Sequence, residues 1–194
     1  MIIGITGSIA SGKTVVTNYL LNNNYKVIDS DKISHEVLLI NDVKQKLINN
    51  FSDIIIDNNN QIDRKQLGKI IFNNKEKKEL LQSIVFPYII KEINNQIEIN
   101  KNEKFIFLDA PLLIEYNLLY LVDKVIVVNI NRNKQIERLM RRDNIDYEYA
   151  NNKINSQLSL QEKLKHADFI IDNNLDINNT INQINNILKQ LEEN

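Results

Sequence analysis

The chain of 194 residues lacks cysteine and tryptophan, and it has only four glycines and two prolines. Without cysteine it can form no disulfide, no thiolate metal site and no cysteine nucleophile. The formal net charge of −1 offers no general surface for nucleic acid or membranes, and no stretch approaches the roughly 20 apolar residues of a membrane span. An apolar run begins at Ile2, so we expect no leader peptide before it. These absences favour a cytoplasmic protein without nucleic-acid or membrane partners.

Three of the four glycines fall within the first twelve residues, where they belong to a phosphate-binding motif. Residues 7–14 read G-x-x-x-x-G-K-T, between a run suited to a strand and a run suited to a helix. The N–H groups of such a loop and of the helix N-terminus suit anionic oxygens. A tight turn with an accidental Lys-Thr pair is the alternative. The predicted nucleotide-binding residues are Gly7, Ser8, Ile9, Ala10, Ser11, Gly12, Lys13 and Thr14.

Two side chains of this loop predict its chemistry. Lys13 would reach the β- and γ-phosphates of a nucleoside triphosphate, and the Thr14 hydroxyl would be a ligand of Mg²⁺. The loop therefore predicts a protein that binds a triphosphate together with Mg²⁺.

Apolar runs, mostly continuous, predict strands that are buried on both faces of a parallel sheet. Helical patterns separate these runs, which favours an α/β fold with helices on both faces of the sheet. The five predicted strands are Ile2–Thr6, Lys26–Ile28, Phe105–Leu108, Lys124–Ile130 and Phe169–Ile171.

Two long segments between these strands are too large for simple connections. Residues 32–103 predict an inserted helical subdomain, and residues 138–165 predict a second helical segment. The remaining segments, 1–31, 104–137 and 166–194, form the predicted core. Isoleucines at helical spacing predict a last helix, Asn178–Leu191, that packs on this core, with a partner-binding helix as the alternative. The helices predicted in the first insertion are Lys32–Asn50, Arg64–Ile71, Lys75–Ile84 and Pro87–Ile99, and Asp53–Ile56 is ambiguous.

Acidic residues follow two of the predicted strands. Asp29 and Asp31 come after the second strand, and Asp109 comes after the third. Ligands of open α/β sheets bind outside the carboxyl ends of the strands, so we expect these carboxylates to face the phosphate-binding loop. A carboxylate there can accept a hydroxyl proton or hold Mg²⁺. The alternative is that Asp29 or Asp31 only caps a helix that starts near Ile33.

Four of the five arginines lie in one window of eleven residues, Arg132, Arg138, Arg141 and Arg142. A guanidinium fork binds phosphate oxygens through two bonds, which an ammonium group cannot do. The last three arginines lie on one helical face. We therefore predict a lid that closes over a triphosphate, with a solvated basic helix face as the alternative.

Six motifs, in order along nearly the whole chain, resemble the dephospho-coenzyme A kinase family. Three departures from the family pattern are Phe86 before Pro87 where histidine is frequent, Lys153 where arginine is common, and Asn174-Leu175 where glycine is frequent. The motifs are Gly4–Gly7 with Gly12-Lys13-Thr14, Asp29–Val37, Asp63-Arg64 with Leu67 and Ile71-Phe72, Asp109–Glu115, Gln135 with Arg138-Leu139 and Arg142-Asp143, and Gln157 with Lys163, Ala167-Asp168 and Ile171–Asn173.

The resemblance implies a P-loop kinase that transfers the ATP γ-phosphoryl group to the ribose 3′-hydroxyl of dephospho-coenzyme A, the last step of coenzyme A synthesis. It implies ATP and Mg²⁺ at the loop, an acceptor site in residues 32–103, and a lid in residues 138–165. Asp31 would orient the acceptor hydroxyl and take its proton. Asp109 would support the metal or the acceptor.

The remaining roles follow from the same resemblance. Arg138 and Arg142 would neutralise phosphate oxygens, and Arg64 and Glu115 would bind the acceptor. Another small-molecule or nucleoside monophosphate kinase is an alternative that differs only in its acceptor contacts. A GTP-binding switch is disfavoured because the N-K-x-D tetrapeptide of that class is absent.

Overall fold

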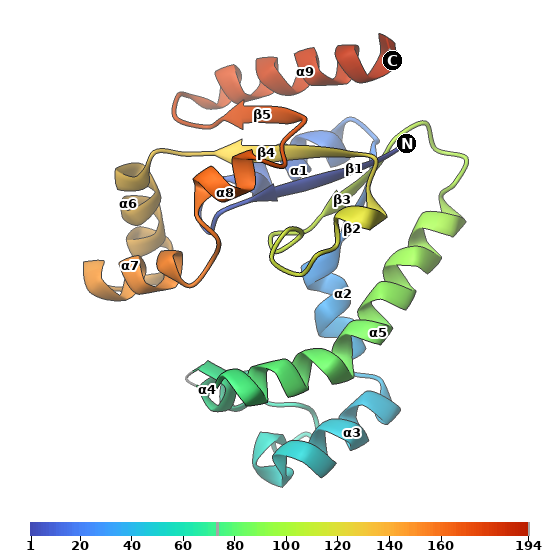
Figure 1. Cartoon of the computed structure of the whole chain (residues 1–194), viewed down its shortest axis with the longest axis vertical. Helices are drawn as coiled ribbons and strands as arrows, with labels where there is room; N and C mark the ends of the chain where they lie inside the picture. Colours follow the sequence, from blue (N-terminus) through green and yellow to red (C-terminus); the bar gives the residue numbers. More distant parts are fainter. Residues whose placement is uncertain (73, 194) are drawn as a thin grey trace. The chain divides into compact units, whose positions relative to one another are not determined.

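The computed structural model describes residues 1–72 and 74–193. The chain divides into two compact units. The first unit combines Met1–Asp29 with the chain from Asn100 onward, and the second unit is Ser30–Ile99. The first unit contains the sheet and the second is helical (Figure 1).

A five-stranded sheet forms the centre of the first unit, with the strand order β2-β3-β1-β4-β5. Every pair of neighbouring strands is parallel. The predicted parallel sheet is confirmed, and each predicted strand bound lies within one residue of the observed one. The strands are β1 (Ile2–Gly7), β2 (Lys26–Asp29), β3 (Ile106–Asp109), β4 (Lys124–Asn129) and β5 (Phe169–Asp172).

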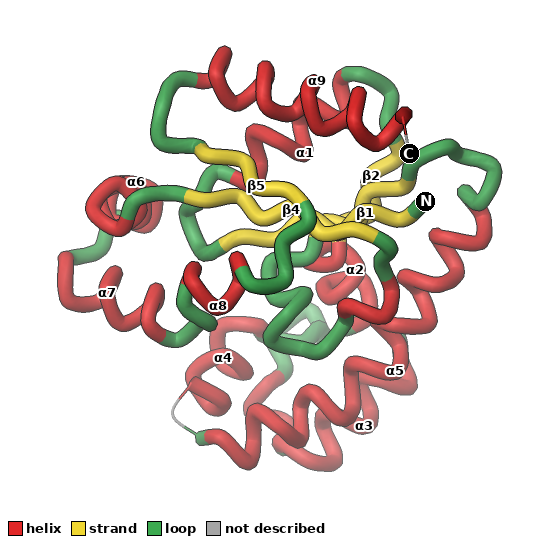
Figure 2. The backbone as a smooth tube through the Cα atoms, turned by 45° about the horizontal axis from the view of Figure 1, so that its top comes forward, coloured by secondary structure: helices red, strands yellow, loops and turns green. Residues whose placement is uncertain are grey.

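Helices cover both faces of this sheet, as Figure 2 shows. Helices α1 (Lys13–Asn22) and α9 (Ile177–Glu193) pack against each other on one face, and α8 (Leu160–Leu164) lies on the opposite face against β4. The short helix η2 (Leu119–Leu121) lies in the connection from β3 to β4. Ile184, Ile187 and Leu188 of α9 are buried in the core, so the expectation that the last helix packs on the core is confirmed.

Two further helices follow β4. Helix α6 (Arg132–Asp143) packs against α7 (Tyr147–Asn155). A small hydrophobic cluster of their own, made by Ile136, Leu139, Ala150 and Ile154, joins the two helices. The main core is separate from this cluster and lies around β1, β3 and β4. The α6–α7 pair is therefore a local unit that begins at the carboxyl end of β4.

The second unit has its own helices around one long helix. α5 packs against α2, α3 and α4. None of the helices formed by the described residues is long and apolar enough to cross a membrane. The elements of the unit are α2 (Ser30–Val37), α3 (Asn41–Phe51), η1 (Asp53–Ile55), α4 (Arg64–Phe72) and α5 (Lys75–Ile99).

Two of the predicted helix boundaries in this unit are wrong. The single helix predicted over Lys32–Asn50 is broken after Val37, and Ile40 is extended before α3 begins. The two helices predicted on either side of Pro87 are one helix, α5. Proline removes one backbone donor and kinks a helix, and Figure 1 shows that α5 changes direction part way along. Buried Val85 and Ile89 flank Pro87, so packing within the unit keeps the helix continuous.

Candidate active site

The phosphate-binding loop, residues 7–14 and here called the P-loop, joins the end of β1 to the start of α1. Gly12 adopts the left-handed region at φ 89°, and Ala10 does so at φ 59°. A Cβ on Gly7 would lie 2.7 Å from Ser11 Oγ and 2.8 Å from the carbonyl oxygen of Val128, so Gly7 is needed for close packing. The Ser11 hydroxyl is buried without a hydrogen-bond partner in the described part of the chain. The loop thus turns sharply into a helix N-terminus, the geometry that suits a phosphate.

Lys13 and Asp109 form an ion pair beside the loop. Lys13 is the first residue of α1, and Asp109 is the last residue of β3. Strand β3 pairs directly with β1, in a register that sets Asp109 opposite Ile5. Both side chains are mostly buried. The structure therefore brings together the predicted phosphate-binding lysine and one predicted carboxylate.

The other two predicted acidic residues lie at the end of β2 and just after it. Asp29 is the last residue of β2 and is paired in register with Asp109. Helix α2 begins at Ser30, two residues before the predicted start at Lys32, so Asp31 lies inside its first turn. The Asp31 carbonyl oxygen accepts a hydrogen bond from Ser34 Oγ at 2.7 Å. Asp31 thus belongs to the second unit, as does Arg64, the first residue of α4.

Arg138 lies beside the P-loop and is half-buried. Its Nη2 donates to the carbonyl oxygen of Asn173 at 3.2 Å, and its Nη1 would lie 3.2 Å from a Cβ on Gly12. Asn173 Nδ2 in turn donates to the Ser11 carbonyl at 2.7 Å, and Asn173 Oδ1 accepts from Thr180 Oγ1 at 2.9 Å. The structure therefore holds one predicted arginine against the loop through the turn that follows β5.

The other predicted lid arginine has a different environment. Arg142 is exposed, in the last turn of α6, and its Nε donates to Asp143 Oδ1 at 2.8 Å. Lys153 of α7 bonds the second oxygen of the same carboxylate at 2.9 Å. The hydrogen bonds from Arg142 and from Lys153 lower the pKa of Asp143 to about 2. The lysine that departs from the family pattern therefore joins α7 to the end of α6.

Glu115 forms a buried ion pair with Lys163. The Lys163 Nζ lies 2.6 Å from Glu115 Oε1 and donates to the Pro111 carbonyl at 2.9 Å. Burial lowers the pKa of Lys163, and the hydrogen bond to Glu115 opposes this effect. Thr6 at the end of β1 also donates to the Pro111 carbonyl, at 3.0 Å. Lys163 therefore fastens the segment after Asp109 to α8, a contact that the sequence did not predict.

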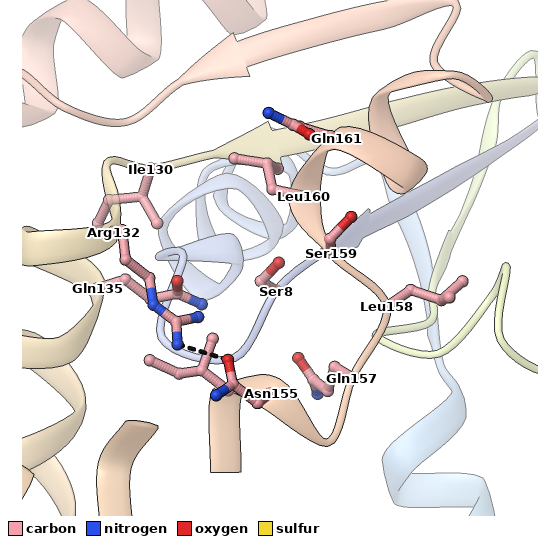
Figure 3. A pocket seen from close by; sticks show the side chains of 11 residues that line it. Ser8, Ile130, Arg132, Gln135, Asn155, Gln157, Leu158, Ser159, Leu160 and Gln161 are labelled. Carbon is pink, nitrogen blue, oxygen red and sulfur yellow. Dashed lines mark hydrogen bonds between the residues drawn. The ribbon is translucent and has the colours of Figure 1, made fainter. Parts of the chain in front are cut away.

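A cavity of about 400 Å³ opens beside Ser8, between α6 and the segment that follows α7 (Figure 3). Arg132, Gln135, Asn155 and Gln157 supply polar groups to its wall, and Arg132 Nη2 donates to Asn155 Oδ1 at 2.7 Å. Within residues 1–72 and 74–193, no group of three or more histidine or acidic side chains lies close enough together to hold a metal ion. A hard cation at the P-loop would need phosphate oxygens and water besides Thr14 and Asp109.

Comparison with known proteins gives a consistent result. The family model for dephospho-CoA kinase matches residues 1–179. A dephospho-CoA kinase from Fusobacterium nucleatum is 40% identical over 184 residues, which are 95% of this chain and 95% of that one. A solved dephospho-CoA kinase from Campylobacter jejuni is 31% identical, with a TM-score of 0.66 over 98% of this chain and 96% of that chain. A crystal structure from Thermus thermophilus has a TM-score of 0.87 at 24% identity over 98% and 97% of the two chains, a likeness of fold alone.

Proposed function

Because the chain belongs to the dephospho-CoA kinase family, we propose that it transfers the γ-phosphoryl group of ATP to the ribose 3′-hydroxyl of dephospho-coenzyme A. One observation carries the proposal. The P-loop, the Asp109 carboxylate at the end of β3 and the Arg138 guanidinium of α6 meet at one edge of the sheet. Phosphoryl transfer needs alignment and charge neutralisation more than covalent help, and these groups supply both.

On the donor side, residues Gly7 to Thr14 would hold the triphosphate through backbone N–H groups and the N-terminus of α1. Lys13 would donate to β- and γ-phosphate oxygens. These oxygens would compete with the Asp109 carboxylate for the Lys13 ammonium group. Thr14 is an exposed residue with a hydroxyl and Asp109 supplies a carboxylate, and oxygen donors of this kind suit Mg²⁺. Mg²⁺ held by Thr14 and Asp109 would neutralise part of the phosphate charge.

Arginines of α6 would complete the charge neutralisation. Arg138 is held next to Gly12, so its fork is close to where phosphate oxygens would lie. Arg142 lies one turn further along α6 and is exposed. Closure of residues 138–165, the proposed lid, would bring Arg142 to the phosphates and exclude water.

On the acceptor side, Asp31 would accept the proton of the 3′-hydroxyl as it attacks the γ-phosphorus. Arg64 of the second unit would bind an acceptor phosphate. Glu115 has one oxygen, Oε2, that is buried without a hydrogen-bond partner in the described part of the chain, and this oxygen would accept a bond from the acceptor. We propose that residues 32–103 bind the acceptor, with Glu115 as an additional acceptor contact, and that the reaction takes place in the cytoplasm without a nucleic-acid or membrane partner.

The test is an acceptor panel. The protein is incubated with Mg-ATP and, in separate samples, with dephospho-coenzyme A, nucleoside monophosphates and shikimate. We expect ADP release only with dephospho-coenzyme A, together with a product of coenzyme A mass. Release with a nucleoside monophosphate instead would identify the alternative kinase class.

A further inference from the structure

Ile9, the third residue of the P-loop, has both of its backbone polar groups bonded to glutamine side chains. Its N–H donates to Gln157 Oε1 at 2.8 Å, and its carbonyl accepts from Gln135 Nε2 at 2.8 Å. Gln135 lies on α6 and is only 4% exposed. Gln157 lies in the segment that follows α7, and both side chains line the cavity beside Ser8 in Figure 3. The two bonds thus come from the two ends of the α6–α7 pair.

Hydrophobic contacts join the same parts of the molecule. Ile9 and Ala10 pack against the small cluster of α6 and α7. Ala10 has a φ of 59°, a region that residues other than glycine adopt reluctantly. The loop therefore needs support at this point from outside its own sequence, and the α6–α7 pair is the element that contacts it.

We propose that Gln135 and Gln157 are positioning residues that hold the P-loop in the shape that accepts a nucleotide, and so couple the α6–α7 pair to nucleotide binding. The inference rests on the proposed function, because the nucleotide is the ligand that the loop would bind there. Helix α6 carries Gln135 and also Arg138, which lies next to Gly12. The two glutamine hydrogen bonds to Ile9, here called the clamp, therefore also set the position of Arg138 relative to the loop. Nucleotide affinity falls when the competent loop is only partly populated, and the coupling is reciprocal.

The directions of the two bonds give a sharp test, since Gln157 accepts and Gln135 donates. Gln157→Glu keeps an acceptor for the Ile9 N–H. Gln135→Glu removes the donor and sets a carboxylate oxygen against the Ile9 carbonyl. Methionine at either position keeps the length of the side chain and removes the bond. The matched control is Gln161→Met, which changes an exposed glutamine that lines the same cavity.

The first measurement is solvent exchange of the Ile9 amide hydrogen, followed by NMR without nucleotide. We expect exchange about tenfold faster in Gln157→Met, Gln135→Met and Gln135→Glu, because each loses one hydrogen bond of the clamp. Gln157→Glu and Gln161→Met should exchange at the wild-type rate. Equal behaviour of the two glutamate variants would overturn the proposal, because packing without bond direction would then explain the contact.

The second measurement is calorimetric binding of Mg-ADP to the wild type, to the two clamp methionine variants and to the control. Both clamp methionine variants should bind about tenfold more weakly, with the affinity for dephospho-coenzyme A unchanged. Unchanged Mg-ADP affinity in both would overturn the coupling. A wild-type protein that binds no Mg-ADP would instead overturn the proposed function, while the exchange pattern still decides whether the clamp exists.

Discussion

Gly12 and Asn173 lie so close that a Cβ placed on Gly12 would be 1.9 Å from Asn173 Nδ2. The same nitrogen donates to the carbonyl of Ser11 at 2.7 Å. Asn173 is 4% exposed and belongs to the turn after β5. Gly12 is therefore required for two independent reasons, its φ of 89° and this contact. The P-loop is held in place by a residue from the far end of the chain.

We expect Gly12→Ala to abolish nucleotide binding and to destabilise the protein, because the new methyl group must displace Asn173 from Ser11. Gly68→Ala is the matched control, since a Cβ on Gly68 would meet no atom within 4 Å in the middle of α4. The control should raise the free energy of unfolding by about 0.5–1 kcal/mol. Urea unfolding and calorimetric titration with Mg-ADP measure both effects. Normal Mg-ADP binding by Gly12→Ala would contradict this prediction.

Lys13→Ala should lower turnover by about 10²-fold or more, because it removes a charge aimed at the transition-state oxygens. The fold should persist, although Asp109 loses its ion pair. Acceptor-dependent ADP release gives the rate, and circular dichroism confirms the fold. Turnover close to wild type in a folded variant would remove Lys13 from the mechanism.

Arg138→Lys and Arg142→Lys keep the positive charge but lose the planar fork. Both should reduce turnover, and Arg138→Lys should reduce it more, because Arg138 already bonds the Asn173 carbonyl beside the loop. Arg141→Lys is the comparison at an exposed position between them; Arg141 lies on the same predicted face but has no assigned phosphate contact, so turnover should fall less than in the other two variants. Steady-state kinetics on the three variants decides the matter. If lysine is tolerated at both positions, the arginines form only a solvated helix face.

Most of the fold was readable from the sequence because the strands are short apolar runs with helical patterns between them. Strands β1, β3 and β4 are buried along almost their whole length, and such runs stand out without any alternation, whereas the edge strands β2 and β5 are only partly buried. The helix boundaries of the second unit were less readable. No proline or glycine marks the break at Leu38–Ile40, and packing of α5 keeps a helix through Pro87 where local propensity predicts an end.

The site residues that lie in one continuous motif could be predicted from the sequence. The contacts between residues far apart in the chain could not. The P-loop and its lysine follow from eight consecutive residues. The partners of Gln157 and Asn173 are backbone atoms 148 and 162 residues away in the chain. Gln157, Lys163 and Asn173 belong to one motif of the family resemblance, but that motif does not say which atoms their side chains bind. Their contacts, and the burial of Lys163 and Asn173, became evident only in the structure.

Removing one partner of the buried Lys163–Glu115 pair should be far more harmful than removing both. Lys163→Met leaves the Glu115 carboxylate buried without its cation, which should lower the free energy of unfolding by about 3–5 kcal/mol. The double variant Lys163→Met with Glu115→Leu should recover most of that loss, since no buried charge remains. A double-mutant cycle by urea unfolding measures the coupling. Additive losses would show that the two side chains do not depend on each other.

Asp31 gives the most direct test of the proton acceptor. Asp31→Asn keeps the size of the side chain but cannot take a proton at neutral pH, and a positioned base contributes about 10²–10⁴-fold. We therefore expect turnover to fall into that range, with Mg-ATP binding unchanged because the P-loop carries it.

A purely structural role for Asp31 predicts a different pattern. Asp31 lies inside the first turn of α2, where its negative charge favours the helix by about 0.3–1 kcal/mol. If that were its only role, Asp31→Asn would lower stability slightly and leave turnover unchanged. Asp42→Asn is the control for turnover, because Asp42 lies in the first turn of α3 in the same unit; its carboxylate also binds Lys46 and Tyr88, so this variant should lose stability and keep its turnover. Thermal unfolding and acceptor-dependent ADP release on both variants separate the two roles. Loss of turnover in Asp31→Asn alone identifies Asp31 as the base, and wild-type turnover in both variants would refute it.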